Sequence, residues 1–258
     1  MNVALLQLDI QWGQPMENIQ RAKRLMDTSG DAQLYVLPEM WATGFVTEPS
    51  GMAEDERASV SLEWMRTVSK ERNCAICGSL AIQTEDGSYR NRQYFVTPQR
   101  VDFYDKHHLF THGGEHRHYT AGSQHKIVEW MGVRFLLLTC YDLRFPVWAR
   151  YGLAGEYDAI IYVANWPQSR QEAWRVLTQA RAIENQCYVV AVNRVGSDPV
   201  TSYAGGSSLI DPVGRMIVES KENAKQALVA PLSIDVLQKA RSRFRVLADR
   251  DAGILFSA

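Results

Sequence analysis

Short apolar segments of strand length alternate with segments of helical periodicity along nearly the whole chain of 258 residues. The helix candidates repeat apolar side chains at helical spacing, whereas the strand candidates are shorter runs bounded by glycine, proline and polar turn residues. Such an alternation predicts an α/β fold. Because the strand candidates outnumber those of a simple doubly wound sheet, we expect two packed sheets with helices outside them.

The sequence predicts a single domain over residues 1–258, with a C-terminal tail from about residue 241. Strands are predicted at residues 3–9, 33–37, 74–82, 92–97, 100–104, 126–130, 133–139, 158–164, 187–193, 206–210, 215–219 and 226–231. Helices are predicted at residues 15–29, 59–73, 145–152, 169–186 and 233–240. The fourth helix is expected to begin at Ser169, because Ser169-Arg170-Gln171-Glu172 has the pattern of a capping box.

Composition and charge exclude several classes of protein. Hydrophobic residues make up 46% of the chain, charged residues 22%, and the net charge is -1, which is typical of a globular protein. Basic residues form no run beyond residues 241–245, so neither nucleic acid nor an anionic membrane is an expected partner. No apolar segment is long enough to span a bilayer, and no signal peptide precedes the first strand. We therefore expect a cytoplasmic protein.

The four cysteines are Cys74, Cys77, Cys140 and Cys187, and the cytoplasm would keep them reduced. Cys74 and Cys77 have the spacing of a redox pair or of half a zinc motif, but no second such pair follows. They also lie in an apolar strand, in which residues three apart face opposite sides. We interpret both as buried thiols, with a redox pair as the alternative.

Glu39, Lys106 and Cys140 each stand at the end of a different predicted strand. Strand ends are where α/β folds collect chemistry. A thiol followed by a helix start is expected to ionise and attack carbon, a carboxylate among apolar neighbours can act as a base, and an ammonium can stabilise an oxyanion. The alternatives are a turn glutamate, a surface lysine paired with Asp105 and an inert buried cysteine.

These residues lie in segments that resemble the three signature segments of the nitrilase superfamily, the carbon–nitrogen hydrolases. The segments are Leu37-Pro38-Glu39, residues 104–110 (YDKHHLF) and residues 140–146 (CYDLRFP). Residues 180–186 and 193–196 resemble later landmarks of that family, so the resemblance covers roughly residues 3–235. Residues 164–167 (ANWP) and 115–119 (EHRHY) are most similar to its bacterial omega-amidase branch.

The resemblance implies a four-layer α-β-β-α sandwich with a Glu39-Lys106-Cys140 triad that works without metal or organic cofactor. The family often places a second glutamate in the loop that holds Glu115. The resemblance also implies a homodimer, with the helix at 169–186 and the short helix after Cys140 as contact elements. The tail contributes further apolar groups that could pack on a neighbour: Val246, Leu247, Ile254 and Leu255.

The omega-amidase branch hydrolyses the terminal amide of short dicarboxylic acid monoamides such as 2-oxoglutaramate. We expect the oxyanion to be held by Lys106 and the backbone N–H of Tyr141. The distal carboxylate of such a substrate needs a cation or several donors, and the candidates are Arg144, Arg117, Arg170, Tyr119 and Trp166. Alternatively, Arg144 pairs with Asp142 or Glu184, and Trp166 caps the core.

All six histidines lie between residues 106 and 125, at positions 107, 108, 112, 116, 118 and 125. They could hold a metal ion, although no cysteine or helical spacing supports one. His107 or His108 could also serve Cys140 in a papain-like pair. Hydrolysis of a carbamoyl compound or a nitrile is the alternative activity, and an inactive binding module is the alternative outside hydrolysis.

Overall fold

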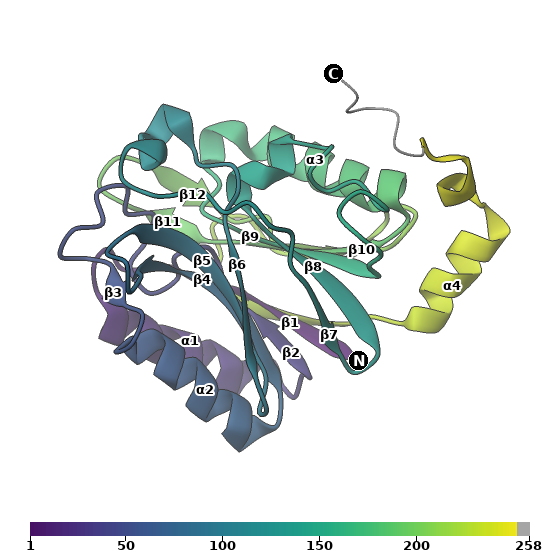
Figure 1. Cartoon of the computed structure of the whole chain (residues 1–258). Coiled ribbons are helices and arrows are strands. Elements are labelled where there is room, and N and C mark those ends of the chain that lie inside the picture. Colours follow the sequence, from purple (N-terminus) through teal and green to yellow (C-terminus); the bar gives the residue numbers. More distant parts are fainter. Residues whose placement is uncertain (252–258) are drawn as a thin grey trace.

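The computed structural model describes residues 1–251 of the chain. Two mixed β-sheets pack face to face, and helices cover both outer faces, which gives the layer order α-β-β-α (Figure 1). This arrangement confirms the predicted class of fold.

The first sheet contains seven strands. They are β1 (Asn2–Gln7), β2 (Leu34–Val36), β3 (Glu54–Asp55), β4 (Ala75–Gln83), β5 (Tyr89–Val96), β6 (Val101–Asp105) and β15 (Gln226–Pro231). Their order is β15-β1-β2-β4-β5-β6, with β3 beside β4. The neighbours β1, β2 and β4 run parallel, so the segments that follow β1 and β2 leave the sheet at the same edge.

The second sheet contains six strands in the order β14-β13-β10-β9-β8-β7. They are β7 (Ile127–Trp130), β8 (Val133–Thr139), β9 (Ala159–Ala164), β10 (Tyr188–Asn193), β13 (Ser208–Ile210) and β14 (Met216–Glu219). The neighbours β8, β9 and β10 run parallel. A separate two-stranded hairpin consists of β11 (Val195–Ser197) and β12 (Ser202–Ala204).

The helices of the outer layers are amphipathic. Helices α1 (Pro15–Ser29) and α2 (Val60–Arg72) pack on the first sheet, with a proline in the first turn of α1 and the Ser59 side chain capping α2. Helix α3 (Gln171–Asn185) packs on the second sheet, and α4 (Ile234–Arg243) lies at one edge of the sandwich (Figure 1).

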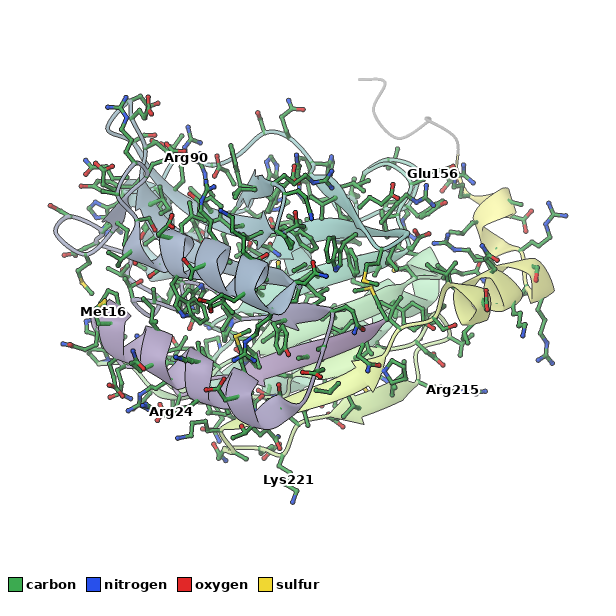
Figure 2. All side chains as sticks on the ribbon, turned by 90° about the horizontal axis from the view of Figure 1, so that it is seen from below. Met16, Arg24, Arg90, Glu156, Arg215 and Lys221 are labelled. Carbon is green, nitrogen blue, oxygen red and sulfur yellow. The ribbon has the colours of Figure 1, made fainter. Side chains whose placement is uncertain are left out.

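The central strands are apolar on both faces because both faces are covered. In β1, Val3 and Leu5 face the core between the sheets, whereas Ala4 and Leu6 face the helices. Phe95 of the first sheet and Phe135 of the second meet between the sheets, with ring centroids 5.9 Å apart. Many charged side chains lie at the surface, among them Arg24, Arg90, Glu156, Arg215 and Lys221 (Figure 2).

Cys74 and Cys77 lie on opposite sides of the first sheet. Cys74 contributes to the core under the helices, and Cys77 contributes to the core between the sheets. Burial raises the pKa of Cys74 to about 11 and that of Cys77 to about 12. The interpretation of both residues as buried thiols is confirmed.

Three local predictions are wrong. Residues 145–152 form turns in place of a helix, because Pro146 and Gly152, whose φ is +91°, interrupt the pattern. The helix predicted from Ser169 begins at Gln171, after a 3-10 turn, and its N-terminus has no side-chain cap. Strands β3, β11 and β12 have only two or three residues each and were not predicted.

The predicted tail begins within α4, which continues to Arg243. Phe244 is 71% exposed, and a 3-10 turn follows at Val246–Asp249. Ile254 and Leu255 lie outside the described residues. A search of residues 1–251 finds no helix with the length and apolar character needed to cross a membrane.

Candidate active site

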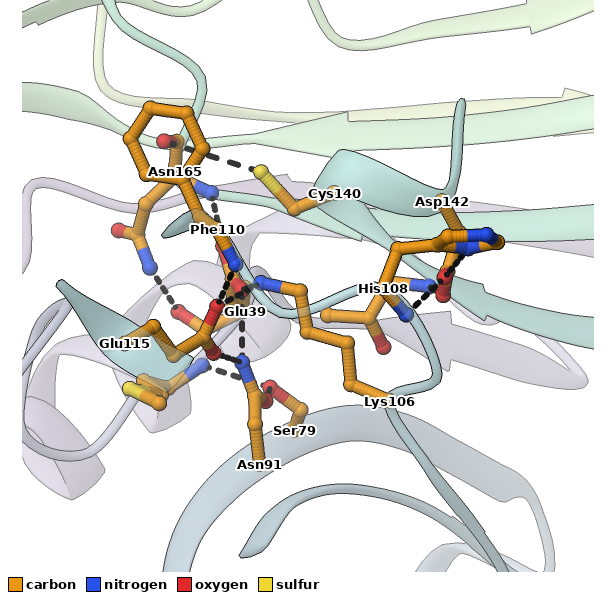
Figure 3. A network of polar contacts seen from close by, with 12 residues as sticks. Glu39, Ser79, Asn91, Lys106, His108, Phe110, Glu115, Cys140, Asp142 and Asn165 are labelled. Carbon is orange, nitrogen blue, oxygen red and sulfur yellow. Dashed lines mark hydrogen bonds and ion pairs between the residues drawn. The ribbon is translucent and has the colours of Figure 1, made fainter. Parts of the chain in front are cut away.

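Side chains from distant parts of the sequence meet at one end of the two sheets (Figure 3). Glu39 follows β2, Lys106 follows β6 and Cys140 follows β8. The Lys106 Nζ lies 2.9 Å from Glu39 Oε1, and both groups act on the ionisation of the Cys140 thiol. The structure therefore brings together the three residues that the strand ends predicted.

A closed ring of hydrogen bonds holds the charged groups in place. The Lys106 ammonium donates to Glu39 Oε1 at 2.9 Å and to Glu115 Oε2 at 2.8 Å. The amide of Asn91, in β5, donates to Oε1 of Glu39 at 2.8 Å and to Oε1 of Glu115 at 2.9 Å. Ser79 fixes the orientation of that amide, because its hydroxyl accepts from the Met40 N–H and donates to Asn91 Oδ1.

All four members of this ring are buried, and the ring carries two carboxylates but one ammonium. Burial alone would lower the pKa of Lys106, but the charges of Glu115 and Glu39 outweigh it and raise that pKa, so the ammonium stays charged. Burial raises the pKa of Glu115 against the opposing charge of Lys106. The alternative of a surface Lys106 paired with Asp105 is wrong, since Asp105 binds Arg92.

The second oxygen of Glu39 has a different environment from the first. Glu39 Oε2 accepts the backbone N–H of Asn165 at 2.8 Å, and the Asn165 side chain donates to the Glu39 carbonyl at 2.7 Å. Oε1 therefore has two donors, and Oε2 has one. The expectation of apolar surroundings for Glu39 is wrong for the carboxylate itself, but Oε2 keeps capacity to accept a further proton.

Cys140 begins a 3-10 turn, Cys140–Arg144, with a left-handed φ of +44°. Thr139 and Asp142 form a capping box around it, in which the Thr139 N–H donates to Asp142 Oδ2 at 2.9 Å. Met40, directly after Glu39, is also left-handed, with a φ of +41°. Such conformations are costly for residues with a side chain and persist only where surrounding contacts enforce them.

The surroundings of the Cys140 thiol disfavour its ionisation. Burial raises its pKa well above the usual value, and the charge of Glu39 raises it further, against the opposing effect of Lys106. The direction of this shift is opposite to the one expected from a helix start after Cys140. Cys140 as a residue is 8% exposed, and its thiol stands beside a carboxylate, which can accept its proton when a reaction begins.

A cavity of about 1060 Å³ opens in front of Cys140. Glu39 and Lys106 lie behind its wall with no exposed surface. Several aromatic residues line the cavity: Trp12, Phe45, Phe110, Tyr141, Trp166 and Tyr203. Two arginines, Arg144 and Arg170, stand in the same wall. Of the three residues, Cys140 lines this cavity, so a reactant that enters it would meet the sulfur first.

The predicted binding residues divide into two groups. Tyr141, Arg144, Arg170 and Trp166 line the cavity, and Trp166 is at the same time 98% buried, since its exposed fraction is 2%. Arg117 and Tyr119 do not line it: Arg117 points to solvent, and the Tyr119 hydroxyl donates to the Val46 carbonyl at 2.7 Å.

Arg144 has no partner among the carboxylates that the sequence suggested. Asp142 accepts hydrogen bonds from Tyr104, His108 and Thr139, and Glu184 binds Arg150 and Arg181. The Arg144 guanidinium lies instead over the Trp166 ring, 4.9 Å from its centroid. The prediction of an Arg144 ion pair is therefore wrong, and the residue keeps its charge for the cavity.

His107 and His108 pack against aromatic rings close to Asp142. His107 stacks on Trp148 with ring centroids 3.7 Å apart, and His108 stacks on Phe145 at the same distance. His108 Nδ1 also binds Asp142 at 2.8 Å, and His107 Nδ1 binds the Gly122 carbonyl. These contacts give both rings partners other than Cys140. Within residues 1–251, no three histidine, cysteine or carboxylate side chains gather as a metal site would require.

Sequence reasoning missed Asn91, Ser79 and Asn165. Asn165 directly follows β9, so the same strand-end signal that indicated the other residues could have indicated it. Asn91 and Ser79 lie within β5 and β4, where an isolated polar residue in a strand resembles many others. The two residues contact each other only because β4 pairs with β5. In that pairing Ser79 lies opposite Gln93, which is two residues from Asn91.

Comparison with known proteins places the chain in a family. Residues 2–242 match the carbon–nitrogen hydrolase family. The omega-amidase YafV of Escherichia coli K12 is 42% identical, with 97% of both chains covered. The 2-oxoglutaramate amidase of Bacillus subtilis is 35% identical, with 93% of both covered. This chain belongs to the carbon–nitrogen hydrolase family, as the sequence segments predicted.

A solved structure supports the same assignment. A CN-hydrolase superfamily protein of Xanthomonas campestris, with an arsenic adduct in its active site, matches with a TM-score of 0.93 and 38% identity. The match covers 99% of this chain and 98% of that one. The four-layer sandwich is therefore the fold of a carbon–nitrogen hydrolase.

Proposed function

We propose that this protein is a thiol-dependent omega-amidase. Its substrate is a short dicarboxylic acid monoamide such as 2-oxoglutaramate, and its products are the acid and ammonia. The observation that carries the proposal is a thiol in a cavity wall, backed by a buried carboxylate and a buried ammonium. The full-length similarity to proteins named for omega-amidase and 2-oxoglutaramate amidase supports the substrate class.

In the first step, the Cys140 sulfur attacks the amide carbon while its proton passes to Glu39. A base is needed at this moment because the raised pKa of Cys140 disfavours the free thiolate. Oε2 of Glu39 is the accepting atom, since Oε1 is occupied by Lys106 and Asn91. The product of this step is a tetrahedral intermediate with a negative oxygen.

Two donors stabilise that oxygen: the Lys106 ammonium and the backbone N–H of Tyr141. One such donor typically contributes about 3 kcal/mol to lowering the barrier. Lys106 suits this role because its raised pKa keeps it charged through the cycle. Glu39 then gives its proton to the amide nitrogen, the carbon–nitrogen bond breaks, and ammonia leaves a Cys140 thioester behind.

Water completes the reaction. Glu39 removes a proton from a water molecule, which attacks the thioester carbon, and the proton returns to sulfur as the acid departs. Glu115 holds Lys106 from the other side and shares Asn91 with Glu39, so it keeps the ammonium in position for both halves. Atoms balance without a metal or an organic cofactor.

Arg144 is the proposed partner of the distal carboxylate. It lines the cavity with Cys140, stands over Trp166, and forms no ion pair within residues 1–251. A guanidinium can bind a carboxylate through two parallel N–H groups, which fixes orientation as well as charge. The ring of Tyr141 packs against Phe110 and Phe145 and lines the same cavity.

Ammonia release from a substrate panel tests the proposal. Wild-type protein and Cys140→Ala are assayed with 2-oxoglutaramate, succinamate, neutral butyramide, an N-carbamoyl amino acid and a nitrile. We expect the two acidic amides to be turned over fastest, and Cys140→Ala to be inactive on all five. Equal rates on succinamate and butyramide would contradict the omega-amidase assignment alone. Wild-type rates in Cys140→Ala would contradict the thiol mechanism.

We further propose that the chain acts as one domain and as a cytoplasmic homodimer. The exposed face of α3 carries Val176 and Ile183, whose exposed fractions are 47% and 53%, and such apolar groups favour association. All four cysteines are free, as a reducing compartment would keep them. Sedimentation velocity measures the oligomeric state, and a monomer at micromolar concentration would contradict the dimer.

A further inference from the structure

A second guanidinium lines the same cavity as Arg144. Arg170 lies in the 3-10 turn before α3, over the ring of Phe110 and 5.6 Å from its centroid. None of the ion pairs formed within residues 1–251 includes Arg144 or Arg170. The cavity wall thus holds two positive charges that the described part of the chain leaves without a counter-charge.

The acidic residues of the same wall do not supply one. The Asp198 carboxylate accepts the N–H groups of Val200 and Thr201, at 2.9 and 2.7 Å, and the Tyr203 hydroxyl at 2.6 Å. Its acceptors are therefore committed to the turn of the β11–β12 hairpin. Glu48 is exposed to solvent and forms no ion pair with either arginine.

Aromatic rings hold both guanidiniums in place without neutralising them. Trp166 connects the two arginines, because its ring lies under Arg144 and its indole N–H donates to the Arg170 carbonyl at 2.8 Å. Its backbone N–H donates to Asn193 Oδ1, also at 2.8 Å. The ring under Arg170 is fixed in the same way, since the Phe110 N–H donates to Glu115 at 2.6 Å.

The size of the cavity makes directed contacts necessary. A volume of about 1060 Å³ is far larger than a five-carbon amide needs, so close fit alone cannot place the amide against Cys140. Two guanidiniums that line one cavity both attract an anion, and a carboxylate in that cavity would supply their missing counter-charge. An anionic group at the far end of the substrate would therefore be drawn to a defined place.

We infer that Arg170 is a second specificity-determining residue, which receives the distal carboxylate of the substrate together with Arg144. This inference rests on the proposed function and deepens it: the substrate class is a short amide whose far end is anionic. Arg117 provides a matched control, because it is an exposed arginine outside the cavity wall.

The test compares succinamate with butyramide, which has the same number of carbons but no charge. We expect Arg170→Met to lower kcat/KM for succinamate about 10- to 100-fold, mainly through KM, because a hydrogen bond to a charged group is lost. Turnover of butyramide should change less than about twofold, as should both substrates in Arg117→Met. Arg170→Lys should recover part of the loss.

Binding gives a readout that does not depend on turnover. Calorimetry measures succinate binding to Cys140→Ala with and without Arg170→Met, and we expect at least a tenfold weaker affinity in the double variant. An unchanged affinity, or equal losses on succinamate and butyramide, would overturn the inference. Wild-type protein that does not prefer succinamate would contradict the proposed function instead, so the two failures can be told apart.

Discussion

Cys140 and Cys77 are both buried thiols with raised pKa values, yet their surroundings differ completely. Cys77 lies between the sheets, where its sulfur receives one hydrogen bond, from Gln93. Cys140 lies in a cavity wall beside the carboxylate of Glu39 and the ammonium of Lys106. The comparison teaches that access and a neighbouring proton acceptor, rather than a lowered pKa, distinguish the candidate nucleophile in this fold.

The largest effect should follow from removing that acceptor. Glu39→Gln keeps the size of the side chain but cannot take the thiol proton, so kcat/KM should fall about 10²- to 10⁴-fold. Ammonia release on succinamate measures the loss. Glu172→Gln is the control, since Glu172 is a surface residue paired with Arg175. Activity within tenfold of wild type in Glu39→Gln would mean that Cys140 loses its proton by another route.

Selective alkylation sharpens the same comparison. Iodoacetamide should modify Cys140 in the folded protein and leave Cys74, Cys77 and Cys187 untouched, because Cys140 lines the cavity whereas the other three have no exposed surface. The pKa of Cys140 lies above its usual value of 9.0, so the thiolate fraction should grow about tenfold per pH unit between pH 7 and 9. Peptide mapping by mass spectrometry follows the rate. A rate that levels off below pH 7 would show a resting thiolate and contradict the assignment.

A smaller effect is expected from Asn91, which separates the two carboxylates. Asn91→Ala removes one N–H donor from Glu39 and one from Glu115, and kcat should fall about tenfold. Loss of a donor disfavours the charged carboxylate, so the pKa of Glu115 rises further and the acid limb of the kcat/KM profile moves to higher pH.

Ser79→Ala is the matched milder variant, because Ser79 contacts the Asn91 amide and the Met40 N–H but neither carboxylate. Its activity should fall by less than that of Asn91→Ala. Thermal unfolding of both proteins checks that the fold is retained. An unshifted acid limb in Asn91→Ala, with normal turnover, would assign Asn91 to the core of the first sheet alone.

Much of the fold could be predicted because the spacing of apolar residues indicates which segments form strands and which form helices. The strands buried on both faces are continuous apolar runs, and α1 has a clear apolar stripe. The segment at 145–152 misled because Val147 and Trp148 resemble a helical pattern, whereas the flanking proline and glycine direct the chain into turns. The three short strands offer too few residues for any period to appear.

The part of the candidate site that lies at strand ends could be predicted from the sequence. Glu39, Lys106 and Cys140 each mark such an end, and the fold brings them to one place. Pairing within the site was less predictable, because partners distant in sequence compete with close ones. Arg144 stands two residues from Asp142, yet Asp142 is already occupied by His108 and Tyr104, which arrive from another strand end.

The left-handed backbone at Cys140 limits which nucleophilic side chains can occupy this position. A β-branched side chain is disfavoured at a φ of +44°, because its second branch would crowd the neighbouring carbonyl. Serine, alanine or glycine could replace the cysteine without rebuilding the turn, but threonine could not. The backbone geometry would therefore accept serine as a hydroxyl nucleophile at this position but not threonine, whatever the reactivity of either hydroxyl.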